Sequence, residues 1–363
     1  MVLMRILQVY MGPYVANKGG GVSVYVRNIS ERLAKKHDVT VFATNPGNLP
    51  RFEVVNGVRV ERFRCFAPSG AYYFSIDMLL RLRRANFDVI HGHCYNAFPM
   101  HFAALARRKI FVVSTHFGGG SSSMFRNVLL RLFKRFGKRT LLEANKIIAV
   151  SFFERDLLIK DFKIDPEKIT LIPCGVNLSE FKVLRKHKRD FRSILYVSNR
   201  LDKFKGACYL IDVLPKLDSD VILEIVGNGV VLKSLEKYAS RRGVLNRVRF
   251  YSYMPQKELF QRYVDADLFV LLSKYESYSM VVAEALAAGT PCIVSRTAAL
   301  NEWIDNETCF GVDFPVNINE LARLITFILH NGADKNKMKK WIGTKILDWD
   351  DVVKRLENVY HGC

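Results

Sequence analysis

The sequence lacks paired cysteines. Its seven cysteines are scattered from Cys65 to Cys363, and no two of them form a C-x-x-C pair. Disulfide frameworks and structural zinc sites need regularly spaced cysteines. We therefore expect free thiols, no metal site and a reducing, cytoplasmic compartment.

Long apolar runs are also missing. A membrane-spanning helix requires about 18 consecutive apolar residues, and no run in this chain approaches that length. The opening residues, MVLMRILQVYM, are interrupted by Arg5 and Gln8 and lack the small-residue cleavage site of a secretion signal. They predict a first buried strand.

Acidic residues are scarce, with 35 Asp and Glu against 55 Lys and Arg and a net charge of +20. Residues 1–184 hold 28 basic and 13 acidic side chains, a difference of +15, and the remainder holds 27 and 22, a difference of +5. Such a field favours an anionic partner: nucleic acid, an anionic membrane or a phosphorylated ligand. Without a helix-turn-helix, an RNA-recognition signature or basic strands with interleaved aromatics, nucleic acid is disfavoured.

The dinucleotide-binding pattern G-x-G-x-x-G is absent as well. Gly19, Gly20 and Gly21 follow the first predicted strand, but Val24 takes the third glycine's place and the next strand ends at Thr44 instead of an acid. A nicotinamide dehydrogenase is therefore disfavoured. The glycines still let backbone approach a ligand closely, although a plain flexible connector is the alternative.

The chain does have a regular alternation of short Val/Ile/Leu-rich runs with stretches of helical spacing. The runs are 5–11, 38–44, 88–93, 110–116 and 146–151, then 193–200, 221–227, 248–254, 268–273 and 291–295. Buried strands that alternate with helices predict α/β folding into doubly wound parallel sheets. Because the rhythm restarts after the basic stretch 185–192, we expect two Rossmann-like domains facing each other across a cleft.

The most informative stretch is KYESYSMVVAEALAAGTPC, residues 274–292, which follows a predicted strand. It sets Glu276 in a loop and Glu284 about one turn inside a predicted helix, 280–288. The start of that helix is a ready site for phosphate. Helical spacing throughout would put the carboxyls about 12 Å apart, farther than paired glycosidase acids. We expect them to hold two parts of one long ligand; one capping acid and one surface acid is the alternative.

E-x7-E followed by EALAAGTPCIVS resembles the retaining nucleotide-sugar glycosyltransferases of family 4, which have the two-domain GT-B fold. The resemblance runs through nearly the whole chain, in PYVANKGGGVSVYV, DVIHGH, VVSTH, ITLIPCGVNLSEF, VSNRLDKFKG, IVGNGV and DADLFVLLS. It implies an acceptor-side domain at 1–184 and a nucleotide-sugar domain at 185–346. The predicted last helix, within 347–363, would cross back onto the first domain.

The resemblance implies a role for each acid. Glu284 would accept hydrogen bonds from the donor ribose and Glu276 from the transferred sugar, as ionised carboxylates can. The remaining donor contacts would come from the amides near Ser279, Met280 and Val281, and from Gly227, Gly20 and Gly21.

Cations and a histidine complete the implied site. Arg200 and Lys205, in VSNRLDKFKG, would clamp the diphosphate, whose charge grows as the glycosidic bond breaks. No metal or other cofactor is then expected, although surface basic residues are the plain alternative. His116 ends VVSTH, where the family has a histidine beside the transferred sugar; a structural histidine is the alternative.

Two other patterns are interpreted as structural, and a third differs from the family motif. His91 and His93 alternate on one strand without a third ligand, and Asp265 and Asp267 imitate a metal-binding D-x-D at a place where Asp commonly serves as a turn or cap. Tyr278-Ser279 stands where many relatives have Phe-Gly, so the diphosphate turn is expected to differ in detail.

The stretch FRNVLLRLFKRFGKRTLLEANK, 125–146, contains seven Lys/Arg and one acid. Its apolar face is Phe125, Leu129, Leu132, Phe133 and Phe136, and Arg131, Lys134, Arg135 and Lys138 lie opposite. A basic amphipathic helix of this type lies on anionic lipid. A helix packed on its own sheet with a solvated basic face is an equal alternative.

Together these observations lead us to expect a retaining, metal-independent transferase that moves a sugar from UDP, or next GDP, to a hydroxyl acceptor. The acceptor would be a glycan or a lipid-linked precursor, reached from the inner membrane face by a peripheral protein. A catalytically inactive sugar-nucleotide-binding scaffold and a basic nucleic-acid-binding protein are the alternatives.

Overall fold

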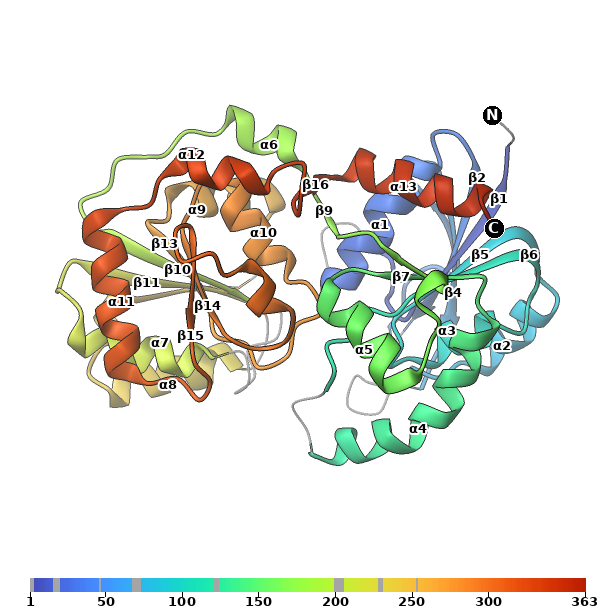
Figure 1. Cartoon of the computed structure of the whole chain (residues 1–363), viewed down its shortest axis with the longest axis horizontal. Helices are drawn as coiled ribbons and strands as arrows, with labels where there is room; N and C mark the ends of the chain where they lie inside the picture. Colours follow the sequence, from blue (N-terminus) through green and yellow to red (C-terminus); the bar gives the residue numbers. More distant parts are fainter. Residues whose placement is uncertain are drawn as a thin grey trace. The chain divides into compact units, whose positions relative to one another are not determined.

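A computed structural model describes residues 3–15, 20–45, 47–66, 73–120, 124–198, 206–227, 231–252 and 254–363, with the backbone alone at 107, 124–132, 231 and 335. The chain forms two compact units (Figure 1). Unit 1 comprises Met1–Gly175 and Trp349–Cys363, and unit 2 comprises Val176–Asp348. The boundaries expected from the sequence are 184/185 and 346/347. No helix among the described residues is long and apolar enough to cross a membrane.

Unit 1 contains a sheet of eight strands in the order β3-β4-β2-β1-β5-β6-β7-β8, in which only β3 runs antiparallel to its neighbour among the described pairs. The strands are β1 (Arg5–Val9), β2 (Asp38–Asn45), β3 (Phe52–Val55), β4 (Val58–Arg64), β5 (Asn86–His93), β6 (Arg107–Ser114), β7 (Lys146–Ala149) and β8 (Ile169–Leu171). The helices are α1 (Gly21–Leu33), α2 (Ile76–Arg83), α3 (Phe98–Ala103), α4 (Met124–Glu143), α5 (Phe152–Phe162) and α13 (Trp349–His361). The central strands are apolar and almost fully buried, as the continuous Val/Ile/Leu runs predict.

Unit 2 contains a parallel sheet of six strands in the order β12-β11-β10-β13-β14-β15. The strands are β10 (Arg192–Ser198), β11 (Val221–Gly227), β12 (Val248–Tyr251), β13 (Leu268–Leu271), β14 (Cys292–Ser295) and β15 (Cys309–Val312). The helices are α6 (Leu178–Val183), α7 (Ala207–Val213), α8 (Val231–Arg241), α9 (Gln256–Asp265), α10 (Met280–Ala287), α11 (Ile318–Asn331) and α12 (Lys335–Met338), with a 3-10 turn, η6, at Ala298–Trp303. Strand order reverses between β10 and β13, so ligands are expected at the carboxyl ends of these two strands.

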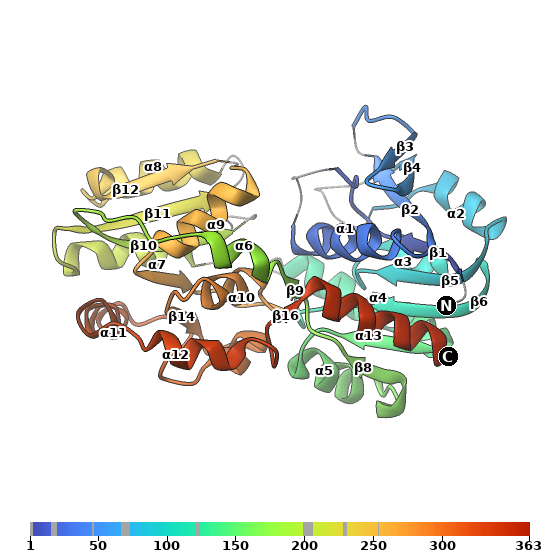
Figure 2. The ribbon, with the colours of Figure 1, turned by 90° about the horizontal axis from the view of Figure 1, so that it is seen from above.

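The C-terminal helix α13 packs within unit 1, beside α1 in both Figure 1 and Figure 2. Tyr360 hydrogen-bonds the buried ring of His91 at 2.7 Å. Glu357 lies 3.1 Å from the Lys36 ammonium and 3.2 Å from the ring of His37. Polar contacts therefore fix this helix onto strand β5 and the end of α1.

The ten predicted strands are all present, but the sequence reading missed the hairpin of β3 and β4. These two strands are joined by Asn56 and Gly57, whose φ values of 49° and 81° are both positive. An Asn-Gly turn with this geometry is the strongest short hairpin signal. The pattern of continuous apolar runs does not predict this hairpin, because FEVV and VRVERFR carry charges and do not resemble strands buried on both faces. The short edge strands β8 and β15 were also missed.

Candidate functional site

The loop that joins β13 to α10, residues 272–279, lies where strand order reverses in unit 2. Gly206, at the start of α7 after β10, packs against this loop. With φ at +82°, it occupies the left-handed region, and a Cβ there would stand 2.4 Å from the Leu272 carbonyl oxygen. Only glycine allows so close an approach, so the chain after β10 and the loop after β13 are fixed against each other.

The first carbonyl groups of this loop are held by hydroxyls of the next strand. The Ser295 and Thr297 hydroxyls each donate to the Ser273 carbonyl at 2.6 Å. The Ser273 hydroxyl in turn donates to the Tyr275 carbonyl at 3.3 Å. The first two bonds fix the Ser273 carbonyl beside the end of β14, and the third is made within the loop.

The end of the loop is anchored in the same way. The Ala299 amide donates to the Glu276 carbonyl at 3.3 Å, and the Trp303 indole N–H donates to the Tyr278 carbonyl at 2.8 Å. Both donors belong to η6, which therefore fixes the backbone that leads into α10. Glu276 lies in this loop, as the sequence predicts, and the loop's hydrogen bonds fix the backbone that carries its carboxyl.

Helix α10 begins at Met280, directly after Ser279. The first amides of a helix have no intrahelical acceptor, and the helix dipole places partial positive charge there. Positions 280 and 281 lie within this first turn. The amino end of α10 can therefore bind an anion such as phosphate.

Glu284 lies one turn inside α10 and is 8% exposed. Burial raises the pKa of its carboxyl to about 7. The Tyr263 hydroxyl is close enough to favour the charged form, but it does not reach the geometry of a full hydrogen bond. A buried carboxyl without a cationic partner is costly, which marks Glu284 as a candidate ligand-binding residue.

Of the other predicted donor contacts in unit 2, Gly227 lies within the described residues, whereas Arg200 and Lys205 do not. Gly227 ends β11 and pairs in register with Ser198, the last residue of β10, so it lies at the same edge of the sheet. Arg200 and Lys205 lie outside the described residues, as does Gly19 of unit 1. The proposed cation clamp therefore remains a prediction.

In unit 1, Gly20 and Gly21 lie where the sequence places them, at the start of α1 after β1. Gly20 is the residue before the helix, with φ of −82° and ψ of −177°, and Gly21 is its first residue. Neither conformation requires glycine. The ligand-contact role of these glycines is thus still a prediction.

His116 follows β6 in a left-handed conformation, with φ of 47°. Its Nε2 atom is buried without a hydrogen-bond partner, and burial lowers the pKa of the ring to about 4. The imidazole is consequently neutral at physiological pH. A buried ring nitrogen without a partner is able to bond a ligand or an ordered water.

The sequence reading missed Glu154, which holds the residues on either side of His116. This fully buried carboxylate accepts from the Thr115 hydroxyl and from the Phe117 amide, both at 2.5 Å. It also accepts from the Val150 amide at 2.8 Å. Glu154 therefore fixes the strained turn that carries His116.

A local signal for Glu154 was present in the sequence. Ser151 directly precedes α5, and its hydroxyl accepts a hydrogen bond from the Glu154 amide at 3.0 Å. This bond is the first half of the S-x-x-E capping pattern. Here the glutamate side chain reaches across to the turn after β6 as well. The pattern marks a helix start but gives no hint of that longer reach.

His91 and His93 have the contacts of structural histidines. His91 bonds Tyr360 and Ser114, at 2.7 and 2.8 Å, and His93 bonds Gln8 at 2.7 Å. Burial lowers the pKa of His91 to about 3 and that of His93 well below its usual value. Among the described residues, no group of three or more His, Cys, Asp and Glu side chains is arranged to hold a metal.

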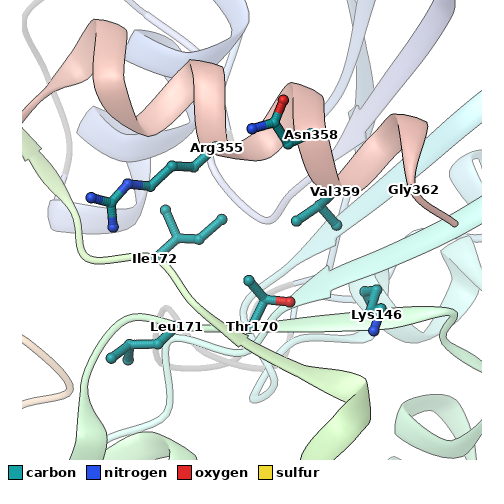
Figure 3. A pocket seen from close by; sticks show the side chains of 8 residues that line it. All are labelled: Lys146, Thr170, Leu171, Ile172, Arg355, Asn358, Val359 and Gly362. Atoms are coloured by element: carbon teal, nitrogen blue, oxygen red, sulfur yellow. The ribbon is translucent and has the colours of Figure 1, made fainter.

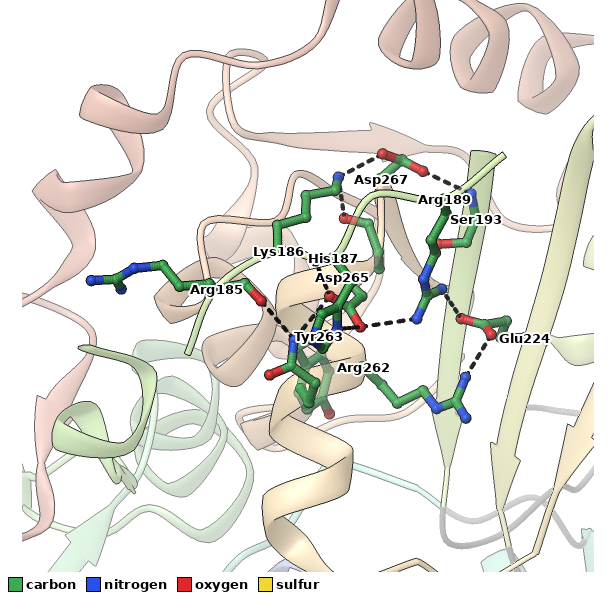
Figure 4. Close-up of polar contacts among 12 residues, drawn as sticks. Arg185, Lys186, His187, Arg189, Ser193, Glu224, Arg262, Tyr263, Asp265 and Asp267 are labelled. Atoms are coloured by element: carbon green, nitrogen blue, oxygen red, sulfur yellow. Dashed lines mark hydrogen bonds and ion pairs between the residues drawn. The ribbon is translucent and has the colours of Figure 1, made fainter. Parts of the chain in front are cut away.

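Asp265 and Asp267 precede β13, at the opposite end of that strand from the 272–279 loop (Figure 4). Asp265 accepts from His187 and Arg189, both at 3.0 Å, and Asp267 accepts from Lys186 at 2.6 Å. We refer to these side chains, together with those of Glu224, Arg262 and Gln261 and the Ser193 amide, as the acid network. Their pairing is that of structural residues, in agreement with the sequence reading.

The structure describes the side chains of α4 from Phe133 onward, which include part of its apolar face and part of its basic face. Phe133 packs against Tyr95, Phe98 and His101, with ring centroids 4.8–5.9 Å apart. Arg139 is 83% exposed on its side chain. The apolar face at Phe133 therefore packs on its own unit, as the alternative interpretation has it, and Phe125, Leu129, Arg131 and Leu132 lie outside the described side chains.

A separate pocket of about 350 Å³ lies in unit 1 between α13 and strands β7 and β8 (Figure 3). Lys146 and Arg355 are its cationic lining residues, and Ile172 and Val359 are apolar. Lys146 is the first residue of β7. Leu171, which also lines the pocket, ends β8 and pairs with Ala149 at the end of β7, so the pocket extends along both strands.

Comparisons with known proteins agree along the whole chain. The model of Glycosyltransferase Family 4 matches residues 19–180, and that of Glycosyl transferases group 1 matches residues 180–343. An uncharacterized glycosyltransferase of Methanocaldococcus jannaschii is 27% identical, over 94% of each chain. The UDP-Gal:alpha-D-GlcNAc-diphosphoundecaprenol alpha-1,3-galactosyltransferase of Escherichia coli is 24% identical, over 78% of this chain and 77% of its own.

Solved structures show the same fold. Sucrose-phosphate synthase from Thermosynechococcus elongatus aligns with a TM-score of 0.81 and 22% identity, covering 99% of this chain and 98% of its own. An Anabaena protein in complex with UDP and glucose aligns with a TM-score of 0.75 and 19% identity, covering 99% and 100%.

Proposed function

Since this chain is a glycosyltransferase of the family 4 type, we propose that it is a retaining, metal-independent enzyme that uses a nucleotide-diphosphate sugar. UDP is the expected carrier and GDP the next. The observation that supports this most is Glu284, a buried carboxyl for which the described residues supply no cationic partner, one turn inside the helix that follows the switch point of unit 2.

Glu284 binds the donor ribose in this proposal. Two vicinal hydroxyls can donate to the two oxygens of one carboxylate, and a bound ribose would supply such donors to this buried acid. Glu276 then holds hydroxyls of the transferred sugar from the fixed loop. The diphosphate between them meets the amides at 280 and 281.

Arg200 and Lys205 are proposed to neutralise the diphosphate as it leaves. In the reaction, the acceptor oxygen bonds to the anomeric carbon while the bond from that carbon to the β-phosphate oxygen breaks. For a retaining, front-face reaction, the acceptor's proton passes to the leaving diphosphate. The two cations stabilise the charge that develops on that group.

The acceptor is proposed to be a hydroxyl of a glycan or lipid-linked precursor, with unit 1 as the acceptor side and His116 as a contact to the transferred sugar. Support comes from the name of the Escherichia coli relative, which specifies a diphosphoundecaprenol-linked acceptor. The basic face of α4, where Arg135 is exposed, offers contact with an anionic membrane surface at the inner face.

The membrane part of this proposal has a direct test. Vesicle flotation should carry the protein with anionic vesicles but leave it behind with neutral ones, and salt should weaken the effect. Replacing Arg135, Lys138 and Arg139 with Gln should reduce flotation. Equal flotation with anionic and neutral vesicles would refute membrane binding through α4 and leave the donor assignment untouched.

The donor assignment is tested by thermal shift with UDP-, GDP- and ADP-sugars. A ligand at 100 times its dissociation constant should stabilise the protein by about 2.7 kcal/mol, and the Glu284→Ala variant should show no such gain. With the stabilising sugar nucleotide and a hydroxyl acceptor, NMR of the product then reports its anomeric configuration. An inverted product would refute the retaining mechanism.

A further inference from the structure

Ser279 has a backbone conformation that serine rarely adopts. It immediately precedes α10 with φ of 78° and ψ of 80°, in the left-handed region. A side chain is disfavoured there because its Cβ crowds the following carbonyl, whereas glycine is accommodated readily. A serine at this position therefore needs a compensating role.

The Ser279 hydroxyl does not fill the role that serine usually has at a helix start. Ser75 and Ser151 begin α2 and α5, and each accepts a hydrogen bond from an amide in the first turn. Ser279 makes no such bond to α10. Its residue is 6% exposed, and its hydroxyl oxygen is buried without a hydrogen-bond partner.

The residue before it is held at both ends. The Tyr278 hydroxyl donates to the Lys345 carbonyl at 2.8 Å, while the Tyr278 carbonyl accepts from the Trp303 indole at 2.8 Å. The rings of Tyr278 and Trp303 also meet edge to face, with centroids 5.2 Å apart. Phenylalanine at 278 would lose the bond to Lys345. This anchoring holds Ser279 in its strained conformation.

Two buried polar groups thus lie at the start of one short helix: the Ser279 hydroxyl has no hydrogen-bond partner among the described residues, and the Glu284 carboxyl has no cationic one. Ser279 stands at its start and Glu284 one turn later. Glu284 has already been assigned to the donor ribose. The diphosphate is attached to that ribose, and the start of the helix is where it would lie.

Building on the donor-binding function proposed above, we propose that the Ser279 hydroxyl donates a hydrogen bond to an oxygen of the donor's diphosphate. Ser279 directly precedes the first amides of α10, so its hydroxyl and those amides belong to the same turn of backbone. In this role the serine adds a side-chain donor to the backbone amides, and the left-handed backbone is retained because it places that hydroxyl next to the anion. Ser279 is then a specificity-determining residue for a phosphorylated ligand.

The test separates the hydroxyl from the backbone. Ser279→Gly removes the hydroxyl and relieves the strain, while Ser279→Ala removes the hydroxyl and keeps the strain. UDP should bind both variants about tenfold more weakly than it binds the wild type, because a hydrogen bond to a charged group is lost. Uridine, which has no phosphate, should bind all three proteins equally.

Stability gives a second, independent readout. Urea unfolding should show Ser279→Gly to be more stable than the wild type and Ser279→Ala to be close to it. The matched control is Asn306→Gly, which relieves a φ of 59° at an exposed position elsewhere in unit 2. That control should gain stability without any change in UDP affinity.

Several outcomes would overturn the inference. Undiminished UDP binding by Ser279→Gly would mean that the hydroxyl makes no contact. A loss in Ser279→Gly alone would identify backbone conformation as the cause, and an equal loss for uridine would identify a general distortion. If the wild type itself bound none of UDP, GDP and ADP, the proposed donor function would fail first, and this inference with it.

Discussion

Unit 2 contains buried acids at both ends of strand β13, and the two groups differ in how they are paired. Before the strand, in the acid network, Asp265 accepts from His187, Arg189 and Gln261 (Figure 4). After the strand, Glu284 has no cationic partner in the described part of unit 2. The two acids are similarly buried, at 4% and 8% exposure.

The pairing decides what each acid does to the fold. Burial raises the pKa of Asp265, but the bonds from His187 and Gln261 and the charge of Arg189 outweigh it, and the net pKa is below the usual value. Burial of Glu284 is not offset, and its pKa rises to about 7. A buried carboxylate that lowers the stability of the folded protein is retained where another role requires it. The comparison therefore favours a structural role for the acid network and supports the proposed ligand-binding role of Glu284.

The largest effect is expected from removing the centre of the acid network. Glu224 is fully buried and accepts from Arg189 at 3.0 Å and Arg262 at 2.7 Å. Glu224→Ala would leave Arg262 without its buried partner and Arg189 with Asp265 alone, which costs about 3–5 kcal/mol. Urea unfolding followed by tryptophan fluorescence should show an earlier transition for unit 2.

The matched control is Asp220→Ala. Asp220 pairs with Arg192 at 2.7 Å, but its side chain is 46% exposed. Exposed pairs contribute about 0–1 kcal/mol, so this variant should unfold like the wild type. An unchanged transition in Glu224→Ala would contradict the structural assignment of the network.

The second effect concerns the lone acid. Glu284→Gln removes the ionised acceptor, and two hydrogen bonds to a charged group are lost, so UDP-sugar affinity should fall about 100-fold or more. Stability should respond in the opposite sense. The pKa of Glu284 lies above that of an unfolded glutamate, so the native state holds more protons between about pH 4.5 and 7, and wild-type stability falls as pH rises through that window.

Glutamine does not carry that pH-dependent penalty. At pH 8 the Glu284→Gln variant should be as stable as the wild type or more stable, by up to roughly 3 kcal/mol, and the difference should shrink towards pH 4.5. Isothermal titration and urea unfolding on the same samples measure both quantities. A variant that is clearly less stable than the wild type at pH 8 would place Glu284 among the structural acids.

The third effect extends the comparison to unit 1, where Glu154 is a buried acid with partners. Glu154→Gln replaces one acceptor oxygen by an amide that cannot accept from Thr115 or Phe117. We expect a loss of about 1–3 kcal/mol in stability and slower sugar transfer, because the turn that carries His116 loosens. UDP affinity, assigned to unit 2, should be unchanged, and a parallel loss of UDP affinity would contradict this separation.

The sequence predicts the fold and the position of the 272–279 loop well, because both follow from local patterns. Continuous apolar runs gave the strands of both sheets, and Glu276 and Glu284 are placed correctly because each lies at a fixed distance after the run 268–273. The hairpin at Asn56-Gly57 also has a local signal, but its charged strands do not match the continuous apolar runs of strands buried on both faces.

The partners of the buried acids had no local signal. Glu154 reaches Thr115, which is 39 residues earlier in the chain, and Asp265 reaches Arg189 across 76 residues. Contacts of this kind depend on which strands become neighbours in the sheet, so the spacing of charges along the chain does not reveal them. The sequence therefore identified acids as candidates, and only the fold separates Asp265 from Glu284.

The smallest expected effect is a pH dependence of donor binding that belongs to Glu284 alone. Its carboxyl must be ionised to accept from ribose hydroxyls, and with a pKa of about 7 in the free protein it becomes protonated as pH falls. Affinity for the UDP-sugar should therefore weaken between pH 8 and 6, approaching tenfold per unit below the pKa. The ring of His116, with a pKa of about 4, stays neutral in this range and does not contribute. Glu284→Gln should show weak binding that is flat over the same range, and an equal slope in this variant would assign the titration to another group.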